Sequence, residues 1–160
     1  MVNTSKTHTN DLYSTLLNLS RNIFFYKRIG LPDTFETRIY LMFIHFSVMM
    51  IVFKNKGKKF NQKSYDSLFH NIENNLREMG FGDVSVNKKM KDYVNLLFSI
   101  IEIVDIWDTF HNSKKNSLIA NYINIDTHND LFVKYFDKFG EFLAKNSLKI
   151  FTKDILELKF

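Results

Sequence analysis

The sequence contains no cysteine, and this absence removes several kinds of chemistry at once. No disulfide, thiolate metal ligand or cysteine nucleophile is possible in such a chain, which suits a reducing compartment. Turn-forming residues are also scarce, with a single proline and five glycines among 160 residues. So few turn formers argue against a β fold with many turns.

Common catalytic motifs are missing as well. There is no Gly-x-Ser-x-Gly elbow, no glycine-rich phosphate loop, no His-Glu-x-x-His zinc motif and no dinucleotide fingerprint. The five histidines are scattered along the chain, at positions 8, 45, 70, 111 and 128. The residues thus give no sign of a catalytic site, and we expect no metal or cofactor.

One acidic series has the residue types of a metal site. Glu102, Asp105, Asp108 and His111 recur every three residues, but three-residue steps drift by about 60° per step around a helix, so these groups do not converge. A di-iron bundle also needs Glu-x-x-His on two helices, and the chain has no second copy. We interpret the series as a solvated acidic ridge.

What the chain does have is aromatic bulk and a moderate positive charge. Aromatic residues make up 16% of the sequence, including 17 phenylalanines, so we predict a ring-rich interior. The net charge of +5 is compatible with an acidic protein, RNA or an anionic membrane surface as a partner. Ordinary solubility explains the same charge equally well.

The first residues carry no recognisable targeting signal. Residues 1–9 are polar and without arginine, so they lack the apolar core of a secretory signal and the pattern of a transit peptide. We expect them to form a flexible tail, and we expect the protein in the bacterial cytoplasm, with the cytoplasmic face of the inner membrane as a peripheral location.

Apolar residues recur at helical spacing from Leu12 onward, and no long segment alternates with a period of two. We predict an all-α fold, a single-domain bundle of about six or seven helices over residues 10–160. The first helix is expected over residues 11–28, ending before Gly30 and Pro32. Asp33 and Glu36 resemble a capping box for the second helix.

The second helix contains the longest apolar run, Ile39 to Phe53. A helix that spans a membrane needs about 20 apolar residues. This run is shorter and contains His45 and Ser47, so we interpret it as a buried central helix, with membrane insertion as the alternative. We interpret His45 as a hydrogen-bonded core residue, with haem ligation as the alternative.

Later elements follow the same pattern. The third helix is expected to carry a stripe ending at Met79, and Gly80 and Gly82 form the turn, after which Asp83 or Ser85 caps the fourth helix. That helix is expected to reach residues 107–111. The remaining expectations are a polar break at 112–116, a short helix at 118–123, a helix capped by Asp126 or Thr127, and a terminal helix at 147–158.

A lysine-rich loop follows the second helix, with Lys54, Lys56, Lys58, Lys59 and Lys63. One interpretation is a solvated connection. The other is a basic surface for lipid phosphates or RNA, where several lysines act together. This loop motivates the alternative function of a peripheral membrane-binding or RNA-binding module.

Two segments carry a more specific pattern. The first consists of Arg21, Phe25, Tyr26, Gly30, Pro32, Asp33, Thr34, Glu36 and Arg38, continued by Leu41 and His45. The second reads Leu-Arg-Glu-Met-Gly-Phe-Gly-Asp from Leu76 to Asp83, followed by a basic helix start. In this order and spacing, the segments resemble the ubiquinol–cytochrome c chaperone family, whose members help assemble the respiratory cytochrome bc1 complex.

The chain departs from the family pattern in two places. Asn71 and Glu73 stand where members often have an acidic pair, so one charge is missing. The segment from Leu97 to Ile100 lacks the glycine and arginine of a Phe-Tyr-Gly-Arg run. The resemblance extends over about residues 10–95.

The resemblance implies an assembly chaperone rather than an enzyme, and it implies that this chaperone binds newly made cytochrome b. The motif residues it marks for partner binding are Arg21, Tyr26, Pro32, Asp33, Thr34, Arg38, His45, Arg77, Glu78, Met79, Gly80, Gly82, Asp83, Lys88 and Lys89. A small helical co-chaperone, the ribosome and the inner-membrane surface are further expected partners.

Two structural expectations complete the hypothesis. We predict a client groove lined by aromatic residues and methionines, with Tyr26, Phe35, Met42, Phe81 and Met90 in it. We also predict that ion pairs, Arg38 with Glu78 or Arg77 with Asp83, fix the corners between helices.

Overall fold

A computed structural model describes residues 4–59, 61–123 and 128–146, with side chains from Leu12 onward. Its elements are α1 (Thr4–Ser20), the π-helical turn η1 (Phe24–Arg28), α2 (Phe35–Asn55), α3 (Gln62–Glu78), α4 (Asp83–Asp105), the 3-10 turn η2 (Trp107–Thr109), α5 (Asn112–Tyr122) and α6 (Asn129–Lys145). There is no strand in these described ranges, and the all-α prediction is confirmed.

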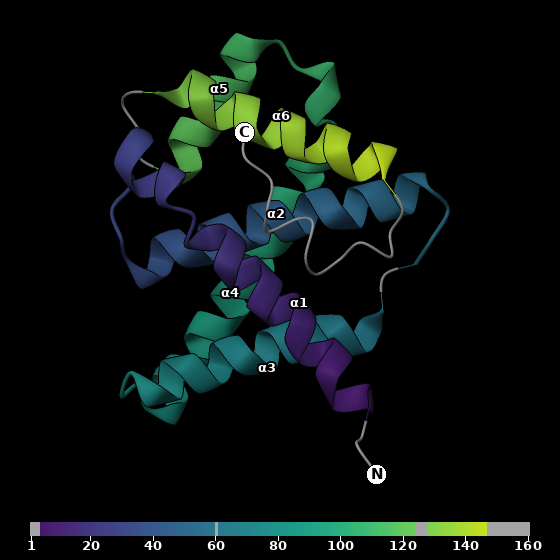
Figure 1. The fold of residues 1–160 in the computed structure, drawn as a ribbon. Helices are drawn as coiled ribbons and strands as arrows, with labels where there is room; N and C mark the ends of the chain where they lie inside the picture. Colours follow the sequence, from purple (N-terminus) through teal and green to yellow (C-terminus); the bar gives the residue numbers. More distant parts are fainter. Residues whose placement is uncertain (1–3, 60, 124–127, 147–160) are drawn as a thin grey trace.

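The helices form three levels around α2 (Figure 1). The α5–α6 pair lies on one side of α2 and α3 lies on the other, while α1 and α4 cross from α2 to α3. The interior between them is rich in rings, as predicted. Its fully buried large side chains include Phe25, Phe43, Phe46, Phe132 and Phe139.

The helix α2 is the centre of this core. Nine of its residues are buried, among them Phe43, His45 and Phe46, because α1, α4 and α6 all pack against it. By length and composition α2 could cross a membrane, yet half of its most apolar stretch is buried inside the protein. A central core helix passes the same test, so the buried interpretation accounts for its apolar character.

The first helix differs from the prediction at both ends. It begins at Thr4, so part of the expected tail is helical, while residues 1–3 lie outside the described residues. It ends at Ser20 instead of near Arg28. Side chains compete for the backbone at that point: the Ser20 hydroxyl donates to the Leu17 carbonyl at 2.7 Å, and the Asn22 amide oxygen accepts from the Phe24 N–H at 3.1 Å.

The start of α2 is capped by a different residue than predicted. Thr34 has an extended backbone, and its hydroxyl accepts from the Thr37 N–H at 3.2 Å, the geometry of an N-cap. Asp33 is not the cap, because its carboxylate binds Arg38. Likewise, Gly82 is the N-cap residue of α4, so neither Asp83 nor Ser85 caps that helix.

Three later expectations also change. The fourth helix ends at Asp105, short of residues 107–111. Residues 112–116 begin α5 instead of breaking the chain, because α5 packs on α6 and buries Lys115 and Ile119 despite its polar start. Met79 is 53% exposed and does not continue the buried stripe of α3. The expected cap at Asp126 or Thr127 and the terminal helix at 147–158 lie outside the described residues.

Candidate functional site

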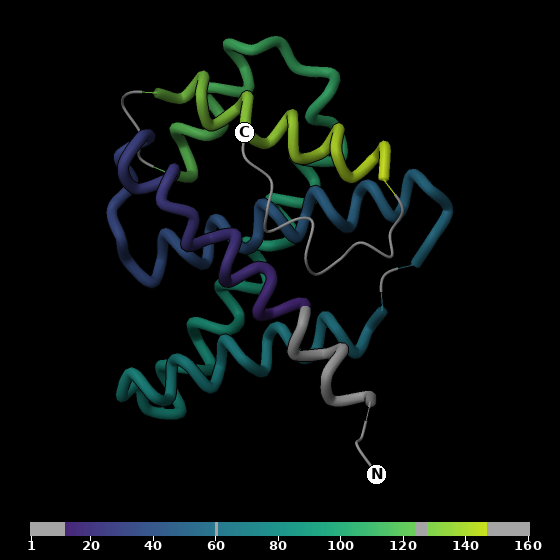
Figure 2. The backbone as a smooth tube through the Cα atoms, in the orientation of Figure 1, coloured from purple at the N-terminus to yellow at the C-terminus, as the bar shows by residue number. Residues whose placement is uncertain are grey.

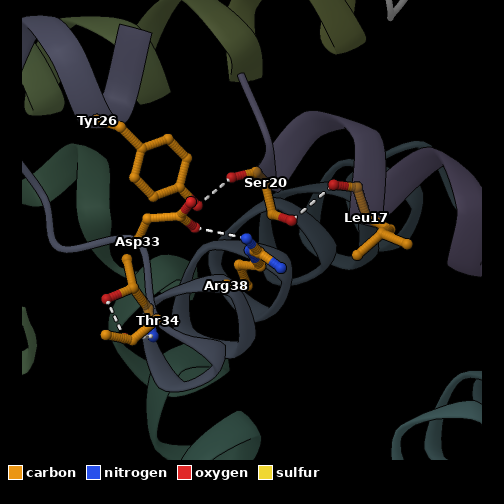
Figure 3. A network of polar contacts seen from close by, with 7 residues as sticks. Leu17, Ser20, Tyr26, Asp33, Thr34 and Arg38 are labelled. Atoms are coloured by element: carbon orange, nitrogen blue, oxygen red, sulfur yellow. Dashed lines mark hydrogen bonds and ion pairs between the residues drawn. The ribbon is translucent and has the colours of Figure 1, made fainter. Parts of the chain in front are cut away.

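The first motif segment forms a corner between α1 and α2 (Figure 3). The Tyr26 hydroxyl donates to the Ser20 carbonyl at 2.6 Å, and the Arg38 guanidinium donates to the Asp33 carboxylate at 2.6 Å. Burial raises the pKa of Tyr26, which stays a neutral donor. The predicted pair of Arg38 with Glu78 is wrong, since Asp33 lies five residues away on the same corner and binds the arginine instead.

The second motif segment forms the corner between α3 and α4, where the chain reverses direction (Figure 2). Gly80 adopts a φ of +94°, the left-handed conformation that closes a helix. Arg77 donates to Asp83 across the corner, which confirms that predicted ion pair, and to Glu73 at 3.1 Å. The corner is thereby fixed by one glycine and one arginine.

The side chains on the outside of this corner face solvent. Glu78, Met79, Gly82 and Lys88 are all exposed, as are Arg21 and Pro32 at the first corner. These motif residues form no buried chemical site, and they are open to a partner.

Sequence reasoning did not find the contacts that join the two motif segments. Tyr93 on α4 donates to Glu36 on α2 at 2.8 Å, and Lys89 lies 3.7 Å from the same carboxylate. The Lys89 ammonium also stacks 5.0 Å from the centre of the Phe81 ring. Burial, together with the hydrogen bond to Glu36, raises the pKa of Tyr93. The first turn of α2 is thus tied to the start of α4.

His45 is a core residue, which confirms its interpretation as a structural histidine. It is fully buried, with Nδ1 2.6 Å from the Leu41 carbonyl and Nε2 2.9 Å from the Tyr135 hydroxyl. A carbonyl only accepts, so Nδ1 carries the proton and Nε2 accepts from Tyr135. With both nitrogens engaged and aromatic rings on several sides, His45 has no nitrogen left for a haem iron.

The lysine-rich loop is only partly a free basic surface. Lys54 pairs with Asp105 at 3.1 Å, and Lys56 donates to the Leu143 carbonyl at 3.0 Å and the Asn146 carbonyl at 2.7 Å. The Lys56 contacts satisfy carbonyls at the end of α6. Lys58 and Lys59 are exposed without such contacts in the described residues.

The apolar groove lies in a different place than predicted. Met42, expected to line it, is only 2% exposed in the core. The structure has a groove of about 400 Å³ between α2, α4, α5 and α6. None of Tyr26, Phe35, Phe81 or Met90 lines it. We call this feature the four-helix groove.

A polar cluster closes one part of the four-helix groove. The Trp107 indole N–H donates to Asp137 at 2.7 Å, and the Lys115 ammonium lies 3.2 Å from the same carboxylate. Lys115 is 8% exposed and also stacks 5.2 Å from the Trp107 ring. The sequence contains little signal for this cluster, because its members lie on η2, α5 and α6 and meet only in the fold.

Comparison with known proteins agrees with these observations. The family model described as "Ubiquinol-cytochrome C chaperone" matches residues 27–110, slightly more than half of the chain. The fold is similar to that in the crystal structure of the Cbp3 homolog from Brucella abortus, with a TM-score of 0.73 and 18% identity, covering 96% of this chain and 93% of that one. No curated protein matches the sequence.

The matched range contains α2, α3 and α4, the second motif corner and most of the first. It also contains the contacts of Glu36 with Tyr93 and Lys89 that hold these helices together. The family model thus matches one connected part of the fold that makes up more than half of the chain. The chain belongs to the ubiquinol-cytochrome C chaperone family.

Proposed function

We propose that this protein is an assembly chaperone that binds newly made cytochrome b and promotes assembly of the ubiquinol–cytochrome c reductase complex. The observation that carries the proposal is the family match over residues 27–110. The protein acts by binding alone, without a catalytic step.

The physical basis is reversible holding of an apolar client. A newly made membrane protein exposes apolar surface until it reaches its lipid or protein partners, and such surface drives aggregation in water. The exposed motif corners offer polar and charged contacts to a partner, and the four-helix groove offers apolar ones. Release then follows from client maturation, because the proposal requires no nucleotide.

We also propose where in the cell the protein acts. It acts in the bacterial cytoplasm, at the cytoplasmic face of the inner membrane where cytochrome b is inserted. Lys58 and Lys59, exposed on the loop after α2, bias it toward anionic surfaces such as the membrane or the ribosome. A small helical co-chaperone is a further proposed partner.

Gene deletion in the source organism tests this function. We expect a strong loss of assembled complex and of cytochrome b, measured by difference absorption spectra and by native gels. A plasmid copy of the wild-type gene should restore both, and an unrelated respiratory oxidase in the same membranes serves as the control. Normal amounts of the complex in the deletion strain would overturn the proposal.

A further inference from the structure

The four-helix groove is an elongated slot. Its lining positions on α2 run from Ile44 to Asn55, and those on α6 run from Phe132 to Ala144. At 1.5 Å per residue these rows are about 16 and 18 Å long, or about three helical turns. Because both walls have this length, the groove matches a short helix better than a compact ligand.

The walls present mainly aliphatic side chains. Val48 and Ile51 come from α2, Ile103 and Val104 from α4, and Leu118 from α5, all of them part-exposed. Gly140 lies within the continuous helix α6 and lines the groove, although glycine inside a helix costs about 1 kcal/mol of helix propensity. A β-carbon at this position would lie 3.6 Å from a methyl group of Val48, so the glycine lets α6 pack closely on α2 along the groove.

The groove is lined by more acidic than basic side chains. Lys115 is the one cation among its lining residues, and Asp137 neutralises it at 3.2 Å. Two other lining carboxylates, Asp108 and Glu141, are exposed and form no ion pair or hydrogen bond within the described part of the chain. An apolar guest that also carries a cation therefore complements both the walls and the rim.

We infer that the four-helix groove binds the apolar face of a client helix of about three turns that carries a lysine or arginine beside that face. Apolar side chains spaced three and four residues apart fill the slot, and the cation lies against Asp108 and Glu141. This inference rests on the proposed function and deepens it, because it assigns the client segment to the groove between α2, α4, α5 and α6.

Fluorescently labelled peptides test the site directly. One peptide of about 14 residues has leucine every third or fourth position with two lysines near its end; its counterpart has two glutamates there. We expect the wild-type protein to bind the lysine peptide about tenfold more tightly, by fluorescence anisotropy. The double variant Asp108→Lys/Glu141→Lys should reverse that preference, whereas Asp66→Lys/Asp92→Lys, with the same change in charge on exposed positions outside the groove, should keep it.

A second variant separates apolar filling from charge. Ala144 is exposed at the groove, so Ala144→Trp should leave the fold intact by circular dichroism and weaken both peptides by about tenfold. Equal affinity for the two peptides in the wild type, or no effect of either groove variant, would overturn the inference. Displacement of the peptide by a single-chain fatty acid, or self-association abolished by Ala144→Trp, would assign a different occupant and also overturn it.

Capture of cytochrome b in cell extracts keeps the two proposals distinguishable. Loss of capture in the groove variants, with capture retained in Asp66→Lys/Asp92→Lys, supports the groove as the client site. Full capture by groove variants that no longer bind the peptide overturns the inference and leaves the proposed function standing. No capture by the wild type counts against the function itself.

Discussion

At the scale of single residues, His45 shows how this core restricts ionisation. Its ring is fully buried, and burial lowers its pKa to about 4 from the ordinary value of 6.5. The neutral ring links α2 to α6 through the Tyr135 hydroxyl. A protonated ring would keep its donor to Leu41, yet it would turn a second N–H toward Tyr135 and carry an unpaired charge in the core.

We predict that the protein loses stability on acidification through His45. The folded pKa lies below the unfolded value, so the unfolded chain binds the extra proton between pH 6.5 and about 4, and stability falls as the pH drops through that window. The free energy of unfolding should decrease by about 1 kcal/mol from about pH 7 to about pH 5.5. Urea unfolding at the two pH values measures it.

The control uses an exposed histidine. His111 lies in solvent at the start of α5, so His111→Gln should keep the pH dependence, whereas His45→Gln should remove most of it while lowering stability at neutral pH. An unchanged pH dependence in His45→Gln would show that other groups titrate on unfolding.

At the scale of elements, the corner between α3 and α4 depends on one glycine and not on the other. Gly80 has a backbone φ of +94°, a value that residues other than glycine rarely adopt. Gly82, by contrast, has an extended backbone at the N-cap of α4. Gly80→Ser should lower the free energy of unfolding by about 1 kcal/mol or more. The same change at Gly82 should be neutral or stabilising by a few tenths of a kcal/mol, since serine is a good N-cap.

Thermal or urea unfolding of the two serine variants checks this. A β-carbon at either position would have no neighbouring atom within 4 Å, so steric clashes do not confuse the comparison. Equal losses at both positions would mean that the corner tolerates no side chain and that backbone conformation is not the cause.

The elements that can be predicted well from the sequence have strong local signals. The stripe of Phe69, Ile72 and Leu76 and the turn at Gly80 locate the end of α3 nearly to the residue. The break after Ser20 has no glycine or proline at the turn itself, so the helical spacing of apolar residues predicts a longer helix than the one that forms. Residues 112–116 lack an apolar stripe, and only packing on α6 makes them helical.

In the candidate site, too, contacts between neighbouring residues can be predicted from the sequence, and contacts between distant residues cannot. The pair of Arg77 with Asp83 spans six residues and could be predicted from one corner. By contrast, Asp137 binds Trp107 and Lys115 from 30 and 22 residues away. The groove joins helices that are far apart in the sequence. Contacts of this kind depend on how helices pack, and a single sequence contains no local pattern for them.

At the scale of the whole molecule, the two motif corners and the four-helix groove involve different segments of the fold. The second motif corner lies between α3 and α4, and the first lies between α1 and α2, where Phe25 packs on α6. The groove lies between the second half of α2, α4 and the α5–α6 pair (Figure 1). The lysine loop begins directly after Asn55, which lines the groove. An exposed basic segment therefore lies next to the proposed client site, where it can draw the protein toward an anionic surface without filling the groove.

This arrangement predicts that membrane attraction and client capture can be uncoupled. Lys58→Glu/Lys59→Glu changes two exposed cations and should reduce binding to vesicles containing anionic phospholipid several-fold, with little effect on unfolding or on capture of cytochrome b. Lys56 is kept, because its ammonium holds carbonyls at the end of α6. Vesicle co-sedimentation at low and physiological salt measures the effect, which screening should weaken.

Exposed lysines outside the loop provide the matched control. Lys134→Glu/Lys138→Glu makes the same change in net charge on the solvent-facing side of α6 and should reduce vesicle binding less. If the loop variant instead loses capture of cytochrome b together with vesicle binding, the loop itself contacts the client. If it loses vesicle or RNA binding and the wild type captures no client, the peripheral binding module is the better description of this protein.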